Sequence, residues 1–120
     1  MALISEDITK AYATPRGPLR VLSGASLTLD AGGRAVIMGP SGSGKSTFLN
    51  ILGTLERPSG GRLMIDECEP FALSETELAR FRNQRIGFVF QDHHLLPHCN
   101  VLENVLIPTL AERRATDPVP

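Results

Sequence analysis

The chain has 120 residues, 42% of them hydrophobic and 21% charged, which fits one soluble globular domain and excludes collagen-like, disordered and disulfide-scaffold proteins. Twelve Lys and Arg residues against 13 Asp and Glu residues give a formal net charge of -1, so we do not expect a nucleic-acid partner. Cys68 and Cys99 lack the spacing of a zinc site and are expected to be reduced. No membrane-spanning run and no signal peptide are evident, so we expect a cytoplasmic protein whose membrane contact comes through a partner.

The first third of the chain predicts strands separated by turns. A short apolar pattern covers residues 3–9, residues 15–18 interrupt it with two prolines and a glycine, and leucines in residues 22–29 restore a period near two. Residues 35–38 form a continuous apolar run, which is typical of a strand buried on both faces. We therefore expect a buried strand at 35–38.

A glycine-rich loop with the sequence G-P-S-G-S-G-K-S-T follows at residues 39–47. The apolar residues after it recur at helical spacing, and they are Phe48, Leu49, Ile51, Leu52 and Leu55. Pro58 and the two glycines at 60–61 end this helix, and residues 62–66 read as a further strand. The order is strand, glycine loop, helix, strand.

Two capping patterns predict helices in the second half. Ser74 with Glu77 three residues later predicts a helix of about residues 75–84. The apolar run at 86–90 predicts a third strand, and Asn100 with Glu103 predicts a helix that Pro108 interrupts. Residues 113–120 have no periodicity and are expected to be frayed.

The glycine loop matches the phosphate-binding pattern G-x-x-x-x-G-K-[ST], with Gly39, Gly44, Lys45 and Ser46 at the defining positions. Glycines let backbone N–H groups turn toward an anion, and the following helix adds its unpaired N–H groups and positive dipole end. Lys45 would place a point charge on the β- and γ-phosphates, and the Ser46 hydroxyl would bind Mg²⁺. The sequence therefore predicts a nucleoside triphosphate with Mg²⁺.

Two competing interpretations of these motifs fail. A dinucleotide-binding fingerprint starting at Gly42 needs a small residue where Thr47 stands. The apolar run ending in Asp66 and Glu67 has the form of a Walker B motif, but it begins within 20 residues of Lys45 and follows only one helix and a turn. We interpret Asp66 and Glu67 as the end of an ordinary strand.

Further motifs lie on both sides of the loop: K-A-Y at residues 10–12, P-S-G-G at 58–61 and I-G-F-V-F-Q at 86–91. With the loop, they resemble the N-terminal half of the nucleotide-binding domain of an ABC transporter, and the resemblance covers almost all 120 residues. R-N-Q at 82–84, Q-D-H-H-L-L-P at 91–97 and L-E-N-V at 102–105 are similar to the lipoprotein-releasing branch of that family. The implied fold is an α/β P-loop NTPase, with an antiparallel β subdomain and the start of a parallel core sheet.

The resemblance assigns roles to residues at matching positions. The ATP-binding residues would be Tyr12, Gly39, Pro40, Ser41, Gly42, Ser43, Gly44, Lys45, Ser46 and Thr47. Tyr12 would stack on the adenine ring, although a lone tyrosine after a strand is more often part of a core. Gln91 would be the Q-loop glutamine, which reaches Mg²⁺ or the attacking water and senses the membrane partner. Lys45 and Gln91 are thus the implied catalytic residues, and Ser46 and Gln91 the implied Mg²⁺ ligands.

Three histidines, His93, His94 and His98, lie close together after Gln91. Adjacent residues rarely direct both rings to one ion, and no nearby acid completes a known spacing, so we do not expect a metal site. The resemblance instead places this segment against a transmembrane subunit. Glu103 has two interpretations, a helix cap or a contact to a coupling helix of that subunit.

The signature motif L-S-G-G-Q, the Walker B aspartate with its catalytic glutamate, and the switch histidine of the family do not occur in residues 1–120. We therefore expect a partial ABC nucleotide-binding domain that binds nucleotide weakly, has no significant turnover alone and is poorly soluble.

The resemblance implies a parent ATPase that hydrolyses ATP and drives lipoprotein release. It would pair with a second ATPase subunit in a nucleotide sandwich and with transmembrane permease subunits, at the cytoplasmic face of the inner membrane. Two alternatives stay open, namely the ATPase of a macrolide or peptide exporter and a non-hydrolysing ATP-binding fragment. A small kinase or GTPase would need an acceptor lid or an N-K-x-D motif, and neither occurs.

Overall fold

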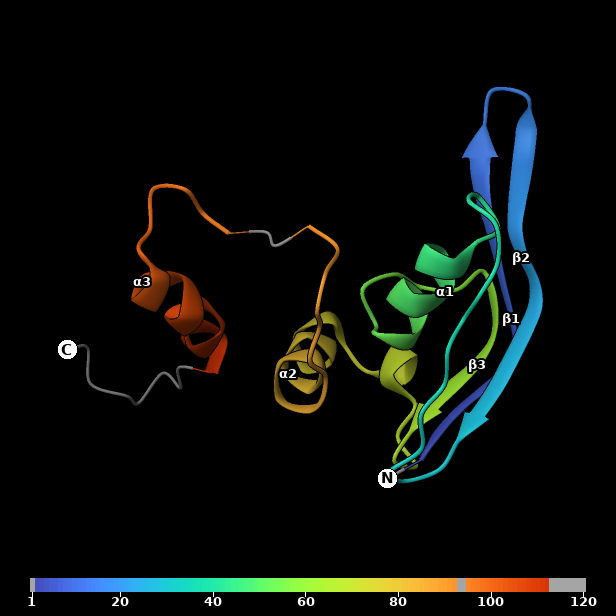
Figure 1. Cartoon of the computed structure of the whole chain (residues 1–120). Helices are drawn as coiled ribbons and strands as arrows, with labels where there is room; N and C mark the ends of the chain where they lie inside the picture. Colours follow the sequence, from blue (N-terminus) through green and yellow to red (C-terminus); the bar gives the residue numbers. More distant parts are fainter. Residues whose placement is uncertain (1, 93–94, 113–120) are drawn as a thin grey trace. The chain divides into compact units, whose positions relative to one another are not determined.

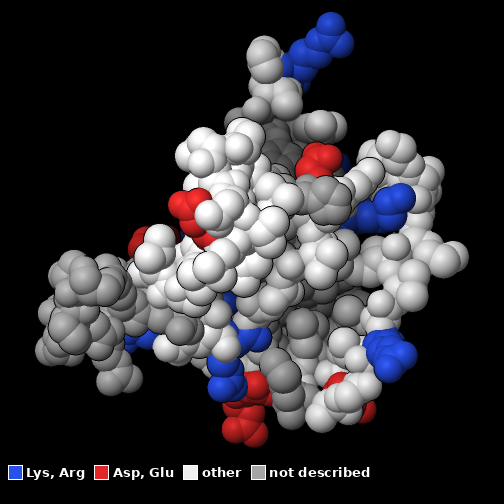
Figure 2. Space-filling model, turned by 60° about the vertical axis from the view of Figure 1, so that its left-hand side comes forward, with Lys and Arg blue, Asp and Glu red and all other residues white. Residues whose placement is uncertain are grey.

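A computed structural model of the chain describes residues 2–92 and 95–112, and the chain divides into two units, Met1–Ser74 and Glu75–Pro120 (Figure 1). The first unit contains three strands and helix α1, and the second contains helices α2 and α3. Acidic and basic side chains are interspersed on the face shown in Figure 2, which fits the formal net charge of -1.

The sheet of the first unit is antiparallel and has the strand order β2-β1-β3. Strands β1 (Leu3–Thr14) and β2 (Gly17–Leu29) form a long hairpin whose register runs from Leu3 opposite Leu29 to Thr14 opposite Gly17. Strand β3 (Gly60–Ile65) pairs with the other edge of β1. The antiparallel β subdomain is thus confirmed, and both hairpin strands extend further than the apolar pattern. Pro18 fits into β2 because β2 is an edge strand, where a missing N–H costs no ladder bond on the open side.

A small apolar core joins the sheet to helix α1 (Lys45–Leu52). The sheet contributes side chains from all three strands, and the buried ones are Ile8, Leu22, Leu63 and Ile65. Helix α1 contributes Phe48, Ile51 and Leu52, which recur at the spacing of one helix face. Each such side chain stabilises the fold by about 1.5–3 kcal/mol when fully buried. This core fixes the position of α1, and with it the end of the glycine loop.

The turn after α1 brings the chain back to β1. Gly53 ends the helix, so the expected end at Pro58 was wrong and Leu55 lies beyond α1. The carbonyl of Asn50 accepts hydrogen bonds from the amides of Leu55, at 2.8 Å, and Glu56, at 3.3 Å. The amide of Ser59 then donates to the carbonyl of Thr9 at 2.8 Å, immediately before β3 begins. These bonds hold residues 54–59 against β1.

Strand β3 ends in a tight turn, as expected for residues 62–66. Asp66 and Glu67 have positive φ angles of 51° and 64°, and Ile65 and Cys68 exchange two backbone hydrogen bonds across them. The Asp66 carboxylate accepts a hydrogen bond of 3.0 Å from the amide of Ala2. This arrangement confirms the interpretation of Asp66 and Glu67 as a strand end. A 3₁₀ turn, η1 (Pro70–Ala72), follows.

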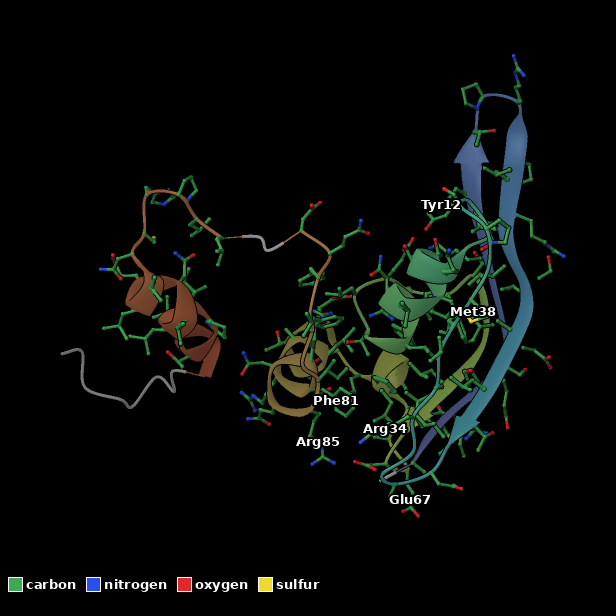
Figure 3. The ribbon with its side chains drawn as sticks, in the orientation of Figure 1. Tyr12, Arg34, Met38, Glu67, Phe81 and Arg85 are labelled. Atoms are coloured by element: carbon green, nitrogen blue, oxygen red, sulfur yellow. The ribbon has the colours of Figure 1, made fainter. Side chains whose placement is uncertain are left out.

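The two strands predicted at 35–38 and 86–90 are absent from the described structure, where both runs lack regular secondary structure. Val36 and Met38 are 83% and 84% exposed, and Val89 is fully exposed. Figure 3 shows Met38 on the segment between β2 and α1. A strand buried on both faces needs neighbouring strands to pair with, and within residues 2–92 and 95–112 the sheet consists of β1, β2 and β3. The expected start of a parallel core sheet therefore does not form here.

The second unit contains the two predicted helices. Helix α2 (Glu75–Arg85) begins directly after Ser74, and helix α3 (Val101–Leu106) continues into a 3₁₀ segment, η2 (Ile107–Glu112), at the predicted interruption by Pro108. Asn100 and Glu103 form the predicted capping box, since each side chain accepts a hydrogen bond from the backbone amide of the other. The predicted frayed end at 113–120 lies outside the described residues.

Asn104 and Asn83 tie segments of the second unit together. The Asn104 side chain accepts a hydrogen bond of 2.8 Å from the amide of Leu96 and donates to the carbonyls of Cys99 and Asn100 at 3.2 and 2.9 Å. The Asn83 amide donates to the carbonyl of Pro108 at 3.0 Å, which links α2 to η2. The loop before α3 is therefore closed by side-chain bonds to backbone.

Substitution of Gly61 by alanine should destabilise the first unit more than substitution of Gly17. Both glycines have left-handed backbones, with φ angles of 92° and 104°. An alanine at either position therefore introduces backbone strain of about 1–2 kcal/mol. A Cβ at Gly61 would also collide with the backbone of β1 at Asp7 and lie 2.7 Å from the carbonyl oxygen of Glu6, whereas a Cβ at Gly17 meets nothing within 4 Å. We expect Gly61→Ala to cost a further ~1–3 kcal/mol.

Urea unfolding of both variants, followed by circular dichroism, measures this difference. Equal losses in the free energy of unfolding would show that the close approach of Gly61 to β1 does not contribute to stability.

Candidate nucleotide-binding site

The glycine loop turns through two left-handed residues before α1 begins. Gly42 and Gly44 have φ angles of 79° and 93°, which residues with a Cβ rarely adopt. A Cβ on Gly44 would also lie 3.0 Å from both the carbonyl oxygen of Val21 and the side chain of Leu22. Gly44 is therefore required for two reasons, its backbone angle and its contact with β2.

The first half of the loop folds back on itself. The amide of Ser43 donates to the carbonyl of Pro40 at 3.2 Å. A Cβ on Gly39 would lie 2.7 Å from Oγ of Ser43, so the Ser43 side chain would have to rotate away from it. Residues 39–43 are all exposed, which leaves the backbone of the turn open to a ligand.

Helix α1 begins at Lys45, immediately after the left-handed Gly44. The first hydrogen bond at this end runs from the amide of Phe48 to the carbonyl of Gly44 at 2.9 Å, and the N–H groups of the first turn have no acceptor within a helix. No acidic residue occurs in the first turn, and no side chain caps it. The positive end of α1 is therefore available to an anion.

Lys45 and Ser46 supply the charged and polar groups of the loop. Nζ of Lys45 donates a hydrogen bond to the carbonyl of Gly39, so the ammonium group lies across the two ends of the loop. Ser46 is exposed in the first turn of α1, where its hydroxyl oxygen is a hard donor suited to Mg²⁺. The bare cradle at Gly39 and Gly44, the helix end, Lys45 and Ser46 together fit a phosphate group with Mg²⁺.

Tyr12 lies beside this helix end rather than in the core. It occupies β1 opposite Leu19 and is 37% exposed, and Figure 3 shows its position on the strand. The Tyr12 hydroxyl donates a hydrogen bond to the Glu56 carboxylate and also interacts with the side chain of Thr47. The structure therefore brings Tyr12 together with the glycine loop, and its exposure argues against the alternative of a core tyrosine.

Lys10 completes the surroundings of Tyr12. Nζ of Lys10 lies 5.1 Å from the centre of the Tyr12 ring, over one face of it. The same atom lies 3.4 Å from Oε1 of Glu56 and donates to the carbonyl of Arg57 at 2.8 Å. Residues from β1 and from the turn after α1 thus meet around one aromatic ring.

The hydrogen bond to the Glu56 carboxylate raises the pKa of Tyr12, because an acceptor on the phenol favours its protonated form. The Thr47 side chain has the opposite, smaller effect on this pKa, while partial burial and the negative charge of Glu56 raise it further. The Tyr12–Glu56 bond is therefore present at neutral pH and is lost as the pH rises through the raised pKa of Tyr12.

Gln91 belongs to the second unit, and its contact with Mg²⁺ stays a prediction. It is exposed and follows the 86–90 run directly. His93 and His94 lie outside the described residues, and His98 is exposed. Within the described part of the chain, no group of three His, Cys, Asp or Glu side chains could hold a metal ion, and Cys68 and Cys99 are free.

Sequence reasoning missed Glu56. It lies 44 residues after Tyr12, in a turn whose sequence carries no motif of its own, so no spacing pattern could connect the two. Lys10 and Thr47 lay within recognised motifs, but their proximity to the Tyr12 ring depends on how the turn after α1 returns to β1.

Residues 22–118 match the family described as ABC transporter. The chain belongs to the ABC transporter family. It is 54% identical over 114 residues to the lipoprotein-releasing system ATP-binding protein LolD 1 of Rhodopirellula baltica. This match covers 95% of this chain and 50% of that protein. It is 51% identical over 102 residues to LolD of Bdellovibrio bacteriovorus, which covers 85% of this chain and 46% of that protein.

A solved structure supports the same fold. The dimeric structure of the bacterial ABC transporter cassette MJ0796 matches with a TM-score of 0.86 and 38% identity, over 97% of this chain and 50% of that one. The same cassette has also been solved in a post-hydrolysis state with ADP and Pi. The chain thus spans about half the length of the relatives it matches. Its described helices include none long and apolar enough to cross a membrane.

Replacing Glu56 by glutamine should lower the pKa of Tyr12 toward the ordinary value of a tyrosine. The amide keeps an oxygen acceptor but removes the negative charge that favours the protonated phenol. Tyr12 is the only tyrosine and the chain has no tryptophan, so the ultraviolet absorbance of tyrosinate reports this group alone in a pH titration.

The matched control is Glu69→Gln, which removes a carboxylate that pairs with Arg62 instead. An identical titration curve for Glu56→Gln and the unmodified chain would contradict the hydrogen bond between Tyr12 and Glu56.

Proposed function

We propose that this chain is the nucleotide-binding part of the ATP-binding subunit of a lipoprotein-releasing ABC transporter, and that residues 39–47 bind ATP with Mg²⁺. The observation that carries the proposal is the loop itself, in which left-handed Gly42 and Gly44 lead directly into the uncapped end of α1. A bare backbone turn followed by a helix end is suited to phosphate oxygens.

Several residues would act on the triphosphate. The backbone amides at the start of α1 would donate to phosphate oxygens, and Lys45 would exchange the carbonyl of Gly39 for the β- and γ-phosphates. Ser46 would hold Mg²⁺, and the family resemblance adds Gln91 as a second ligand. When bound, Mg²⁺ neutralises the charge of the β- and γ-phosphate oxygens. Lys45 and Gln91 are the residues that we propose act directly on the reacting phosphate and water.

Tyr12 would bind the base. Its exposed ring lies next to the first turn of α1 through Thr47, so a nucleotide whose phosphates occupy the loop would have its base near this ring. Stacking on an aromatic face suits a purine, because both partners are flat and apolar on their faces.

The transported substrate and the partners follow from the relatives. Proteins that resemble this chain at 44–54% identity over 85–95% of its length are named for lipoprotein release, which favours that substrate over macrolides or peptides. We propose hydrolysis of ATP by the whole subunit, as a dimer like the MJ0796 cassette, with each nucleotide held between two subunits. We further propose that it binds permease subunits at the cytoplasmic face of the inner membrane, where Gln91 would sense the permease.

Replacing Lys45 by alanine should weaken the binding of Mg-ATP by about 10- to 100-fold. A charged hydrogen bond to phosphate contributes ~1.5–3 kcal/mol, and the neutral variant leaves the β- and γ-phosphate charge without its nearest cation. Isothermal titration calorimetry of the 120-residue chain with Mg-ATP measures the loss directly.

Arg62→Ala is the control, because it also removes one positive charge from the first unit. Arg62 lies on β3, outside the loop, and pairs with Glu69. An equal loss in both variants would show that net charge and not the loop attracts the nucleotide. No detectable binding by the unmodified chain would refute nucleotide binding by this loop as it stands in the 120 residues.

A further inference from the structure

Lys10, Tyr12 and Glu56 form a side-chain cluster, called here the Tyr12 cluster, whose arrangement phosphate binding does not explain. None of its members belongs to the glycine loop, and it joins β1 to the turn after α1 across 44 residues of sequence. The Thr47 side chain, at the end of the glycine loop, nevertheless interacts with the Tyr12 hydroxyl and lowers its pKa.

Lys10 and Glu56 of the Tyr12 cluster are each held by a further contact. The amide of Glu56 donates to the carbonyl of Asn50 at 3.3 Å, which fixes its backbone to the end of α1. Nζ of Lys10 donates to the carbonyl of Arg57 at 2.8 Å and lies 3.4 Å from the Glu56 carboxylate. The Glu56 carboxylate, which accepts the hydrogen bond from the Tyr12 hydroxyl, is therefore held in place. Its hydrogen bond restricts the motion of the Tyr12 ring, because the carboxylate does not move with the ring.

The cluster also distinguishes the two faces of the Tyr12 ring. Lys10 lies over one face, with Nζ 5.1 Å from the ring centre. A planar base needs a whole ring face for stacking. A base would therefore stack on the face away from Lys10, and Tyr12 as a residue is 37% exposed.

We propose that Glu56 is the positioning residue of the base site: through the Tyr12 hydroxyl it fixes the ring, with Lys10 on one face, so that the other face is ready for the purine base before the nucleotide binds. This inference rests on the proposed function, since it requires that Tyr12 stacks on the base. An aromatic ring that is already fixed loses less side-chain entropy on binding than a free one, and the gain appears as affinity for the base alone.

The test compares two ligands, Mg-ATP and magnesium tripolyphosphate, by calorimetry on the 120-residue chain. Tripolyphosphate fills the glycine loop but has no base, so it reports the phosphate site without the Tyr12 cluster. The variants are Glu56→Ala, Tyr12→Phe, the double variant, and Glu56→Gln, with Glu69→Ala as the control at a carboxylate that pairs with Arg62.

Glu56→Ala and Tyr12→Phe should each raise the Kd for Mg-ATP by about three- to tenfold, and leave that for tripolyphosphate unchanged. The double variant should bind Mg-ATP like either single variant, because both remove the same hydrogen bond. Glu56→Gln should restore part of the affinity through its amide oxygen, and Glu69→Ala should bind both ligands like the unmodified chain.

Three results would overturn the inference. If Glu56→Ala binds Mg-ATP like the unmodified chain, the hydrogen bond does not position the ring. If it weakens both ligands equally, Glu56 acts on the fold of the loop and not on the base. If the losses of the two single variants add fully in the double variant, Glu56 and the Tyr12 hydroxyl act separately. Failure of the proposed function looks different, because then the unmodified chain binds neither ligand.

Discussion

The candidate site depends on the bare backbone of Gly44, where the glycine loop passes against β2. Its left-handed φ of 93° directs the chain into α1, and a Cβ at this position would lie 3.0 Å from both Val21 and Leu22 and force them to shift. Leu22 is also a core residue, so the packing that stabilises the sheet determines where α1 begins. The buried face of α1 then holds the helix in place. The unpaired amides at the start of α1 are available to a ligand, and no further group is needed to position them.

Strand β1 connects the phosphate part of the site to the part proposed for the base. Its central position in the sheet lets it pair with β2 on one edge and β3 on the other. Two hydrogen bonds join the turn after α1 to β1. The amide of Ser59 donates to the carbonyl of Thr9, and the amide of Ala11 donates to Oγ of Ser59 at 3.0 Å. The same turn carries Glu56. Because β1 bears Lys10 and Tyr12 and also holds this turn, the Tyr12 ring and Glu56 are attached to the same strand.

Local sequence predicted those features that depend on neighbouring residues. The glycine loop, the start of α1 and the capping box of Asn100 and Glu103 are set by contacts within a few residues and formed as predicted, whereas α1 ends at Gly53 and not at Pro58. The strands expected at 35–38 and 86–90 did not form, because an apolar run shows that a strand is suited to burial but does not supply the neighbours it must pair with. Glu56 was missed for a related reason, since its bond to Tyr12 depends on a return of the chain that no local pattern encodes. The role of Tyr12 at the base and that of Gln91 at Mg²⁺ remain predictions.

The two ends of the glycine loop are held unequally, and this bears on how strongly the chain can bind phosphate. The end at Gly44 is fixed by β2 and by the core face of α1, whereas the start at Gly39 follows the exposed 35–38 run, which pairs with no strand among the described residues. The bond from Lys45 to the carbonyl of Gly39 joins the weakly held end to the firmly held one. A nucleotide that draws Lys45 to its phosphates breaks this bond, so its own contacts must order the start of the loop in exchange. Part of the binding free energy is spent on that ordering, which is the physical reason to expect weak binding by these 120 residues even though the cradle is well formed.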